Sequence, residues 1–307
     1  MADGTLHDRL AALVALEPAL ADELALRGAL IELLDHADVP VGELRAPADL
    51  VRARLAAGVP LLQQLALPVP SSVVALFERL AVAMLTDPSV RDAAEALLLA
   101  VRSHRLHPEQ LVAEAVVGHA EHLEQLAEAA GIPSALVDPL ADLAARPLLA
   151  AVAARLGPAL GLGDWTQGYC PVCGGRPILA ERIPQTGTGV AAGGPSARLR
   201  CGRCVTGWVW PWAVPACPVC GDGDLNAVAS LPVYDLGIWD LFGCRDCGSA
   251  MKRADRPRSE RLAHLLLDDL ASWQLDQEAL AMGLSRPGGI GYRLEHADVD
   301  VSEHDDD

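Results

Sequence analysis

All eight cysteines of this chain belong to Cys-x-x-Cys pairs, and no cysteine is left over. In chain order the pairs are Cys170/Cys173, Cys201/Cys204, Cys217/Cys220 and Cys244/Cys247. Two-residue spacing lets both sulfurs of a pair face one ion, while backbone amides in the tight turn point at the thiolates. We therefore predict that the eight cysteines are metal ligands and form two four-thiolate sites.

The order of the pairs favours one grouping. A Cys-x-x-Cys knuckle, a strand hairpin and a second knuckle are typical of a zinc-ribbon or rubredoxin-like unit. That order occurs twice, which favours grouping the first knuckle with the second and the third with the fourth. An interleaved grouping stays open. No histidine lies between residues 165 and 258, so all-cysteine ligation follows.

Zinc and iron both accept four thiolates in tetrahedral geometry, so we predict two metal ions per chain, iron or zinc, without separating the two. A structural zinc site contributes about 10–16 kcal/mol to folding. We therefore expect metal removal to unfold residues 165–255 and to spare the helical half. Disulfides are one alternative, and they need an oxidising compartment. Thioredoxin-type redox pairs are another, and they need a βαβ context that the flanking sequence lacks.

Glycine follows the second cysteine of three pairs, at Gly174, Gly221 and Gly248. A positive φ at this place closes the turn, and glycine adopts it without steric cost. The pair Cys201/Cys204 departs from this rule, because Val205 follows it.

Composition indicates which elements carry the cysteines. Apolar residues make up 51% of the chain and aromatic residues only 4%, a mixture that favours packed helices. Gly, Pro, Cys and Trp become frequent near Gly161. We predict an α+β protein with an all-α helical bundle at 1–160 and a double rubredoxin-like or zinc-ribbon metal module at 161–257. A C-terminal helix packed on the module or the bundle follows at 258–290, and an acidic disordered tail at 291–307.

Prolines mark expected helix starts at Pro18, Pro88 and Pro108, because proline fits the first turn of a helix. The last of them should open one helix that ends at Gly131. Residues 184–197 are rich in glycine and predict a flexible loop inside the metal module. The C-terminal helix should bury an apolar stripe made of Leu262, Leu266, Leu270, Trp273 and Leu280.

The formal charge of −17 argues against a general nucleic-acid binder, because phosphate contacts need a positive surface. The N-terminus lacks a basic region followed by an uninterrupted apolar stretch, and no later segment has the length of a membrane span. We therefore expect a cytoplasmic protein without a membrane partner, in which thiols stay reduced.

Two further groups of side chains have competing interpretations. Trp208, Trp210 and Trp212 alternate, so on a strand they would share one face, either packed over the knuckles or exposed as a docking patch. Eight cations make the cysteine region locally basic, either as a contact for an acidic partner or as ordinary solvated surface. They are Arg198, Arg200, Arg203, Arg245, Lys252, Arg253, Arg256 and Arg258.

Positive evidence for an enzyme is absent from the sequence. His119 and His122 are spaced to share a metal, but a histidine on an apolar helical face is usually a core or boundary residue. There is no phosphate loop, nucleophile elbow or dinucleotide fingerprint. We therefore predict no catalytic and no cofactor-binding residues.

The cysteine region resembles the FdhE family of formate dehydrogenase accessory proteins over roughly residues 165–285. The resemblance is carried by CPVCGGRP, by LRCGRCVTGWVWPWAVPACPVCG with its Trp208, and by CRDCGSAMKRAD with the later DDLASWQLDQEALAMG. Gly207 stands where the family often has an acidic residue, Ala250-Met251-Lys252 replaces its aromatic-lysine ending, and 184–197 resembles an insertion.

The resemblance implies a cytoplasmic assembly factor that binds iron in rubredoxin-like sites and associates with the catalytic subunit of a formate dehydrogenase. It also implies that the metal module and the C-terminal helix form the client-binding face. Two other functions stay open: a rubredoxin-like electron carrier or redox component, and a zinc-ribbon nucleic-acid-binding protein. The sequence does not decide whether the chain forms a homodimer.

Overall fold

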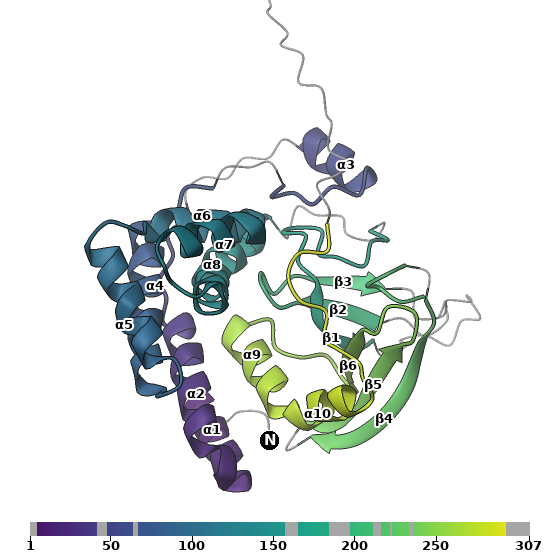
Figure 1. The fold of residues 1–307 in the computed structure, drawn as a ribbon. Coiled ribbons are helices and arrows are strands. Elements are labelled where there is room, and N and C mark those ends of the chain that lie inside the picture. The colour runs from purple at the N-terminus through teal and green to yellow at the C-terminus, as the bar shows by residue number, and fades with distance from the viewer. Residues whose placement is uncertain are drawn as a thin grey trace, which may run out of the picture.

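A computed structural model describes residues 5–41, 48–63, 67–156, 165–183, 197–210, 216–221, 223–233 and 236–292. The N-terminal half is a group of helices that stands beside a six-stranded sheet, and the last two helices lie against both (Figure 1). The predicted α+β class is therefore confirmed. The predicted boundary near residue 161, most of the loop at 184–197, Trp212 and most of the acidic tail lie outside the described residues.

The helices of the N-terminal half are α1 (Leu6–Leu16), α2 (Ala21–Asp35), α3 (Ala48–Ala56), α4 (Ser71–Ala83), α5 (Arg91–Arg102), α6 (Pro108–Val117), α7 (Ala120–Ala129) and the long α8 (Ser134–Leu156). Helices α2, α4, α5, α6 and α7 pack around α8, whereas α1 packs on α2 and on the C-terminal helix α9 (Leu262–Ala271). Short 3₁₀ turns, η1 (Pro18–Leu20) and η2 (Met84–Thr86), precede α2 and α5. Small residues on α8, among them Ala141, Ala144 and Ala145, are fully buried and let neighbouring helices approach closely.

The single helix expected from Pro108 to Gly131 is wrong. Gly118 adopts a left-handed conformation with φ 82°, which ends α6, and its amide donates to the carbonyls of Glu114 and Ala115. A glycine in this position is a common helix C-terminus. His119 is then the N-cap residue of α7, without a side-chain capping bond, so it lies at the break between the two helices.

The six strands form one sheet in the order β3-β2-β1-β6-β5-β4. They are β1 (Pro177–Arg182), β2 (Ala197–Cys201), β3 (Gly207–Trp210), β4 (Leu225–Val233), β5 (Gly237–Cys244) and β6 (Ala250–Ala254). Neighbouring strands are antiparallel, except that β1 and β6 run parallel. The sheet thus consists of two three-stranded units, β1–β3 and β4–β6, joined at the β1–β6 pair.

The C-terminal segment forms two helices, α9 (Leu262–Ala271) and α10 (Trp273–Ala281), where one was expected. They meet at Ser272, whose buried hydroxyl donates to the backbone carbonyls of Asp268 and Asp269. The helix α9 packs on α1, α2 and α8, whereas α10 contacts β4 and β5.

The predicted apolar stripe of this segment is correct only in part. Leu262, Leu266 and Leu270 of α9 are partly buried and pack against the apolar clusters, whereas Leu280 of α10 is 69% exposed. The most buried positions on the two helices are Ala263, Leu265, Leu267, Asp268, Leu275 and Ala279. The change of direction between the two helices alters which residues share a face, so the stripe does not continue onto α10.

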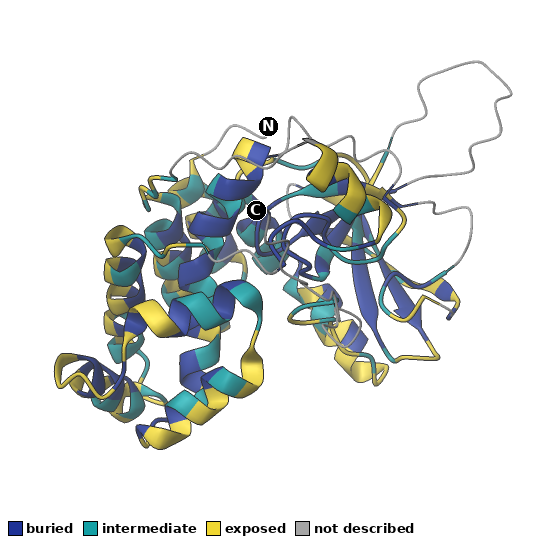
Figure 2. Ribbon diagram, turned by 90° about the horizontal axis from the view of Figure 1, so that it is seen from above, coloured by how far each residue is buried: buried dark blue, intermediate teal, exposed yellow. Residues whose placement is uncertain are grey.

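One apolar cluster extends from the helices to the first cysteine group. It contains Phe77 of α4, Leu111 of α6 and Leu149 of α8 together with Cys170, Cys173, Cys201 and Cys204. Figure 2 shows the buried sides of the helices and the buried strands facing one another. None of the described helices combines the length and the apolar character needed to span a bilayer.

Candidate metal centres

The four Cys-x-x-Cys knuckles have one backbone design. In each, the amide four residues after the first cysteine donates to that cysteine's carbonyl: Gly174 to Cys170, Val205 to Cys201, Gly221 to Cys217 and Gly248 to Cys244, at 2.8–3.1 Å. The residue that closes each turn has a positive φ, between 65° and 86°. The repeated knuckle predicted from spacing is therefore present four times.

Val205 adopts the same left-handed conformation that glycine provides in the other three knuckles, with φ 65°. A β-branched residue in this region costs roughly 1–2 kcal/mol. Its side chain is 8% exposed and packs in a cluster with Trp239 and Leu265, so its burial offsets part of that cost.

Site 1 consists of Cys170, Cys173, Cys201 and Cys204. The hairpin of β1 and β2 separates its two knuckles and returns the chain, so that the sulfurs of all four residues lie within 4.8 Å of one another. The Sγ–Sγ distances are 3.4 Å between Cys170 and Cys204 and 3.5 Å between Cys173 and Cys201.

Site 2 consists of Cys217, Cys220, Cys244 and Cys247, brought together by the hairpin of β4 and β5. Its Sγ–Sγ distances are 3.8 Å for Cys217–Cys247 and 3.8 Å for Cys220–Cys244. The structure thus groups the knuckles sequentially, as preferred from the sequence, and not in the interleaved way.

Both sulfur groups fit a tetrahedral ion. Four thiolates about 2.3 Å from a central zinc ion are about 3.8 Å apart, close to the distances in both sites. Backbone amides also donate to sulfur, from Val172 to Cys170, Arg203 to Cys201 and Val219 to Cys217, each at 3.4 Å. Such donors stabilise thiolates and therefore favour metal ligation over protonated thiols.

The two sites differ in exposure. All four cysteines of site 1 are buried, whereas Cys220 and Cys247 of site 2 are exposed. Burial raises the pKa of the Cys170 thiol well above its ordinary value. Burial also acts to raise the pKa of Cys247, but hydrogen bonds from the Ser249 side chain and backbone outweigh it and lower this pKa to about 7.

The Arg203 side chain, in the second knuckle of site 1, links this site to the helices. Arg203 lies between Cys201 and Cys204, and its guanidinium donates to the carboxylate of Asp142 on α8 and to the carbonyl of Ala115 on α6. The segment after α3 holds the first knuckle, because the amides of Leu61 and Leu62 donate to the carbonyls of Pro171 and Val172.

Most of the eight cations expected on the surface are largely buried and form ion pairs inside the molecule. Arg200 pairs with Glu181 at 3.2 Å, and both side chains are 1% exposed. Buried Lys252 contacts Asp269 at 2.7 Å and Asp276 at 3.0 Å. Arg203, Arg253 and Arg258 are also largely buried and pair with Asp142, Asp240 and Asp268. For these five residues, both a contact for an acidic partner and a solvated surface are therefore wrong. Of the remaining three, Arg245 and Arg256 are exposed and Arg198 is partly exposed.

Trp208 and Trp210 share one face of β3 as predicted, and both are buried in the large apolar cluster. Packing is thus the correct interpretation for these two. His119 and His122 each contact the carboxylate of Glu114, at 2.9 and 3.0 Å, and are nearly half exposed. Among the described residues, the two cysteine groups are the clusters whose ligand atoms converge on one point.

Sequence reasoning missed the acidic partners of the buried cations. Glu181 and Asp142 lie 19 and 61 residues from Arg200 and Arg203. Asp268 lies 10 residues from Arg258, and each of the three acids stands in an ordinary mixed-charge segment. The strand positions of Arg200 and Lys252 could have indicated that acidic partners exist, because a cation that points inward from a strand needs a partner.

No protein-family model matches the chain, but comparison with known proteins finds relatives in sequence and in structure. The Protein FdhE homolog of Aquifex aeolicus (strain VF5) is 31% identical over 119 residues, which span 39% of this chain and 39% of that relative. The crystal structure of the FdhE protein from Pseudomonas aeruginosa aligns with a TM-score of 0.56 at 21% identity, covering 92% of each chain. The second comparison shows the shared fold, and the first adds a likeness in sequence.

Proposed function

Because fold and sequence both support membership of the FdhE family, we propose that this chain is a metal-binding accessory protein for the assembly or maturation of formate dehydrogenase. It binds the catalytic subunit in the cytoplasm and performs no turnover of its own. The single observation that carries this proposal is the pair of four-cysteine groups set in an FdhE-like fold. When bound, zinc or iron would crosslink the two knuckles of each site.

The sites have separate roles in this proposal. Site 1 is embedded in the apolar cluster shared with the helices, so it holds the sheet in place. Site 2 belongs to a small separate cluster with Leu225 and Phe242, and two of its cysteines reach the surface. Site 2 and the adjacent C-terminal helices are therefore the part of the module available to a client protein.

Exposed apolar side chains next to site 2 support the same client-binding surface. Leu280 on α10 is 69% exposed, and Met282 directly after α10 is 44% exposed. The chain then returns to site 2, because the amide of Ser285 donates to the carbonyl of Gly248, the residue after Cys247. An apolar surface beside a metal site suits a chaperone that shields an unfinished protein.

Affinity capture of the formate dehydrogenase catalytic subunit by the tagged chain tests the proposal. We expect capture by the wild-type chain, a severalfold loss in Leu280→Glu, and no loss in Leu99→Glu. Leu99 is a matched control because it is also a helical leucine, 61% exposed on α5. No capture by the wild-type chain would overturn the proposed function, whereas equal capture by both variants would overturn only this binding face.

The metal dependence of capture is a separate measurement. The double variant Cys220→Ser/Cys247→Ser removes two ligands of site 2 at the surface and leaves site 1 intact. We expect it to lose capture while keeping its helical circular dichroism. Undiminished capture by this folded, site-2-deficient variant would exclude site 2 as part of the client-binding surface.

A rubredoxin-like electron carrier is a second candidate, favoured by the exposed cysteines of site 2. Electron transfer needs a metal close to the protein surface, and Cys220 and Cys247 provide that position. This function predicts a reversible one-electron titration of the iron-loaded protein. Protein isolated without air that contains zinc and no iron would exclude it.

Nucleic-acid binding is the weakest candidate. Arg200, Arg203 and Lys252 are neutralised by buried or partly buried carboxylates, so they offer no charge to phosphates. With a net charge of −17, we expect no salt-sensitive binding to DNA or RNA.

A further inference from the structure

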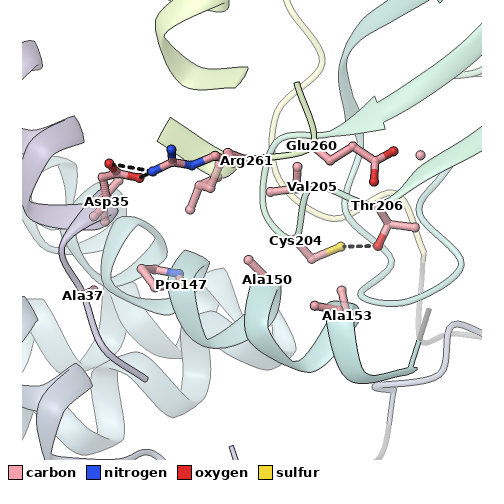
Figure 3. Close-up of a pocket in the computed structure, with 14 residues that line it drawn as sticks. Asp35, Ala37, Pro147, Ala150, Ala153, Cys204, Val205, Thr206, Glu260 and Arg261 are labelled. Atoms are coloured by element: carbon pink, nitrogen blue, oxygen red, sulfur yellow. Dashed lines mark hydrogen bonds and ion pairs between the residues drawn. The ribbon is translucent and has the colours of Figure 1, made fainter. Parts of the chain in front are cut away.

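A solvent-connected cavity of about 740 Å³ lies between the helices and the second knuckle of site 1. Its walls come from the end of α2, from α8, from the turn after Cys204 and from the segment before α9 (Figure 3). We propose that this cavity is the route by which thiophilic metal ions reach and leave the buried site 1. The inference rests on site 1 holding a metal ion and is independent of the client protein.

Cys204 is the ligand that opens to the cavity. Of the four site 1 cysteines, it is the one among the lining residues, although it is only 2% exposed. Figure 3 shows its sulfur directed toward the hydroxyl of Thr206, 3.1 Å away, and both residues line the cavity. An ion that travels through the cavity would therefore meet this sulfur first, with a polar group beside it.

The wall opposite Cys204 exists because α8 carries small residues there. Ala150, Ala153 and Ala154 line the cavity, and Ala150 and Ala153 face the second knuckle in Figure 3. Larger side chains at these positions would occupy the space that connects Cys204 with solvent. The cavity is thus a property of particular α8 residues, which makes it testable by single substitutions.

Acidic groups border the opening of the cavity. The carboxylate of Glu260 is 82% exposed, and Asp35 at the end of α2 receives two hydrogen bonds from Arg261, at 2.9 and 3.0 Å. The Asp35–Arg261 pair links α2 with the segment before α9 across one side of the cavity. The ion pair therefore limits how far the opening widens.

Site 2 has no need of such a route, since Cys220 and Cys247 are exposed. The chain therefore contains its own internal control. A change in the cavity should alter the exchange of metal at site 1 and leave site 2 unaffected.

The test is the exchange of zinc for Cd²⁺ in the full-length, zinc-loaded protein. A colorimetric indicator measures the released zinc over time. We expect a fast phase from site 2 and a slow phase from site 1. The variant Cys220→Ser/Cys247→Ser assigns the phases, because it should keep one zinc ion and show the slow phase alone. If this variant holds no zinc, site 1 is not a metal site and the premise fails.

Substitutions in the cavity then test the route itself. Ala150→Leu and Ala154→Leu should each slow the site 1 phase severalfold, whereas Arg261→Ala should accelerate it, with the fast phase unchanged. Ala151→Leu is the matched control, because Ala151 lies on the same turn of α8 but does not line the cavity. Urea unfolding of each variant identifies any change in global stability.

A site 1 rate that is the same in wild type and in both leucine variants would overturn the proposal. So would a site 1 rate that follows the global free energy of unfolding across all variants, since exchange would then proceed by unfolding of the chain and not through the cavity.

Discussion

The guanidinium of Arg203 donates from Nε to the carboxylate of Asp142 at 2.7 Å, joining the second knuckle to the central helix α8. Burial acts to lower the pKa of Arg203, but the Asp142 carboxylate and then the Cys173 thiolate outweigh it and raise this pKa above its ordinary value. The cation therefore stays charged between a metal site and the helical core.

Replacing Arg203 with methionine should destabilise the zinc-loaded protein by about 2 kcal/mol. This is below the roughly 3–5 kcal/mol for breaking a fully buried ion pair, because the Asp142 side chain is 32% exposed and keeps its contact with Arg146. The Ala115 carbonyl would lose its donor as well. The measurement is urea unfolding followed by both tryptophan fluorescence and helical circular dichroism.

Arg146→Met is the control for this prediction. Arg146 contacts the same Asp142 carboxylate at 2.9 Å, but it lies one turn away on α8 and does not touch the knuckle. We expect it to cost less than about 1 kcal/mol, as for a partly exposed helical pair. Equal costs for the two substitutions would contradict a special linking role of Arg203.

Alanine substitutions at two glycines near site 2 should distinguish the cost of backbone strain from the cost of steric crowding. Gly221 has φ 86°, and no heavy atom lies within 4 Å of the position that an added Cβ would take, so Gly221→Ala should cost only about 1 kcal/mol of strain. At Gly223 an added methyl group would overlap the Cys244 sulfur. We expect Gly223→Ala to weaken zinc binding at site 2 far more than Gly221→Ala, measured by competition with a chelator. The reverse order would show that the positive φ, and not the space around the sulfur, governs the site.

The cysteine spacing predicted most of the metal centres, because a knuckle is a local structure. Its turn, its positive φ and its sulfur directions depend on a few neighbouring residues, as the common geometry of Gly174, Gly221 and Gly248 shows. The order of the knuckles also predicted their grouping, since a hairpin between two knuckles returns the chain to its start.

Other features could not be predicted because they depend on distant contacts. Gly118 was compatible with a continuous helix until the packing of α6 and α7 on α8 favoured two short ones. The buried positions of Arg200 and Lys252 depend on Glu181 and Asp269, which come from other elements. The cavity beside Cys204 likewise requires the position of α8 relative to the sheet.

Loss of the two metal sites should have different consequences. Cys201→Ser/Cys204→Ser changes residues inside the cluster shared with the helices, so we expect it to lower the stability of the helical half as well as the sheet. This differs from the sequence-based expectation that the helical half is spared. Cys220→Ser/Cys247→Ser should affect mainly the ends of β4 and β5. Near-ultraviolet circular dichroism of the tryptophans and thermal unfolding of the helices distinguish the two cases, and identical losses in both variants would contradict the prediction.

The acid sensitivity of the fold should depend on Asp269. Burial acts to raise its pKa, but Lys252 and then Arg286 outweigh this effect and lower it from 3.8 to about 2. Because the folded state binds the proton less readily than the unfolded state, the stabilisation is complete above about pH 4 and is lost as the pH falls toward 2.

A shift of this size corresponds to about 2 kcal/mol at neutral pH. Asp269→Asn mimics the protonated carboxyl, so the difference in unfolding free energy between wild type and this variant should be largest above about pH 4 and shrink below it. Comparing the two proteins at each pH cancels the effect of acid on the cysteines, which both retain. Asp22→Asn at the start of α2 is the control for the general effect of removing one carboxylate. A difference that stays constant down to the lowest pH at which both proteins fold would mean that the Lys252 and Arg286 contacts do not stabilise the ionised carboxylate.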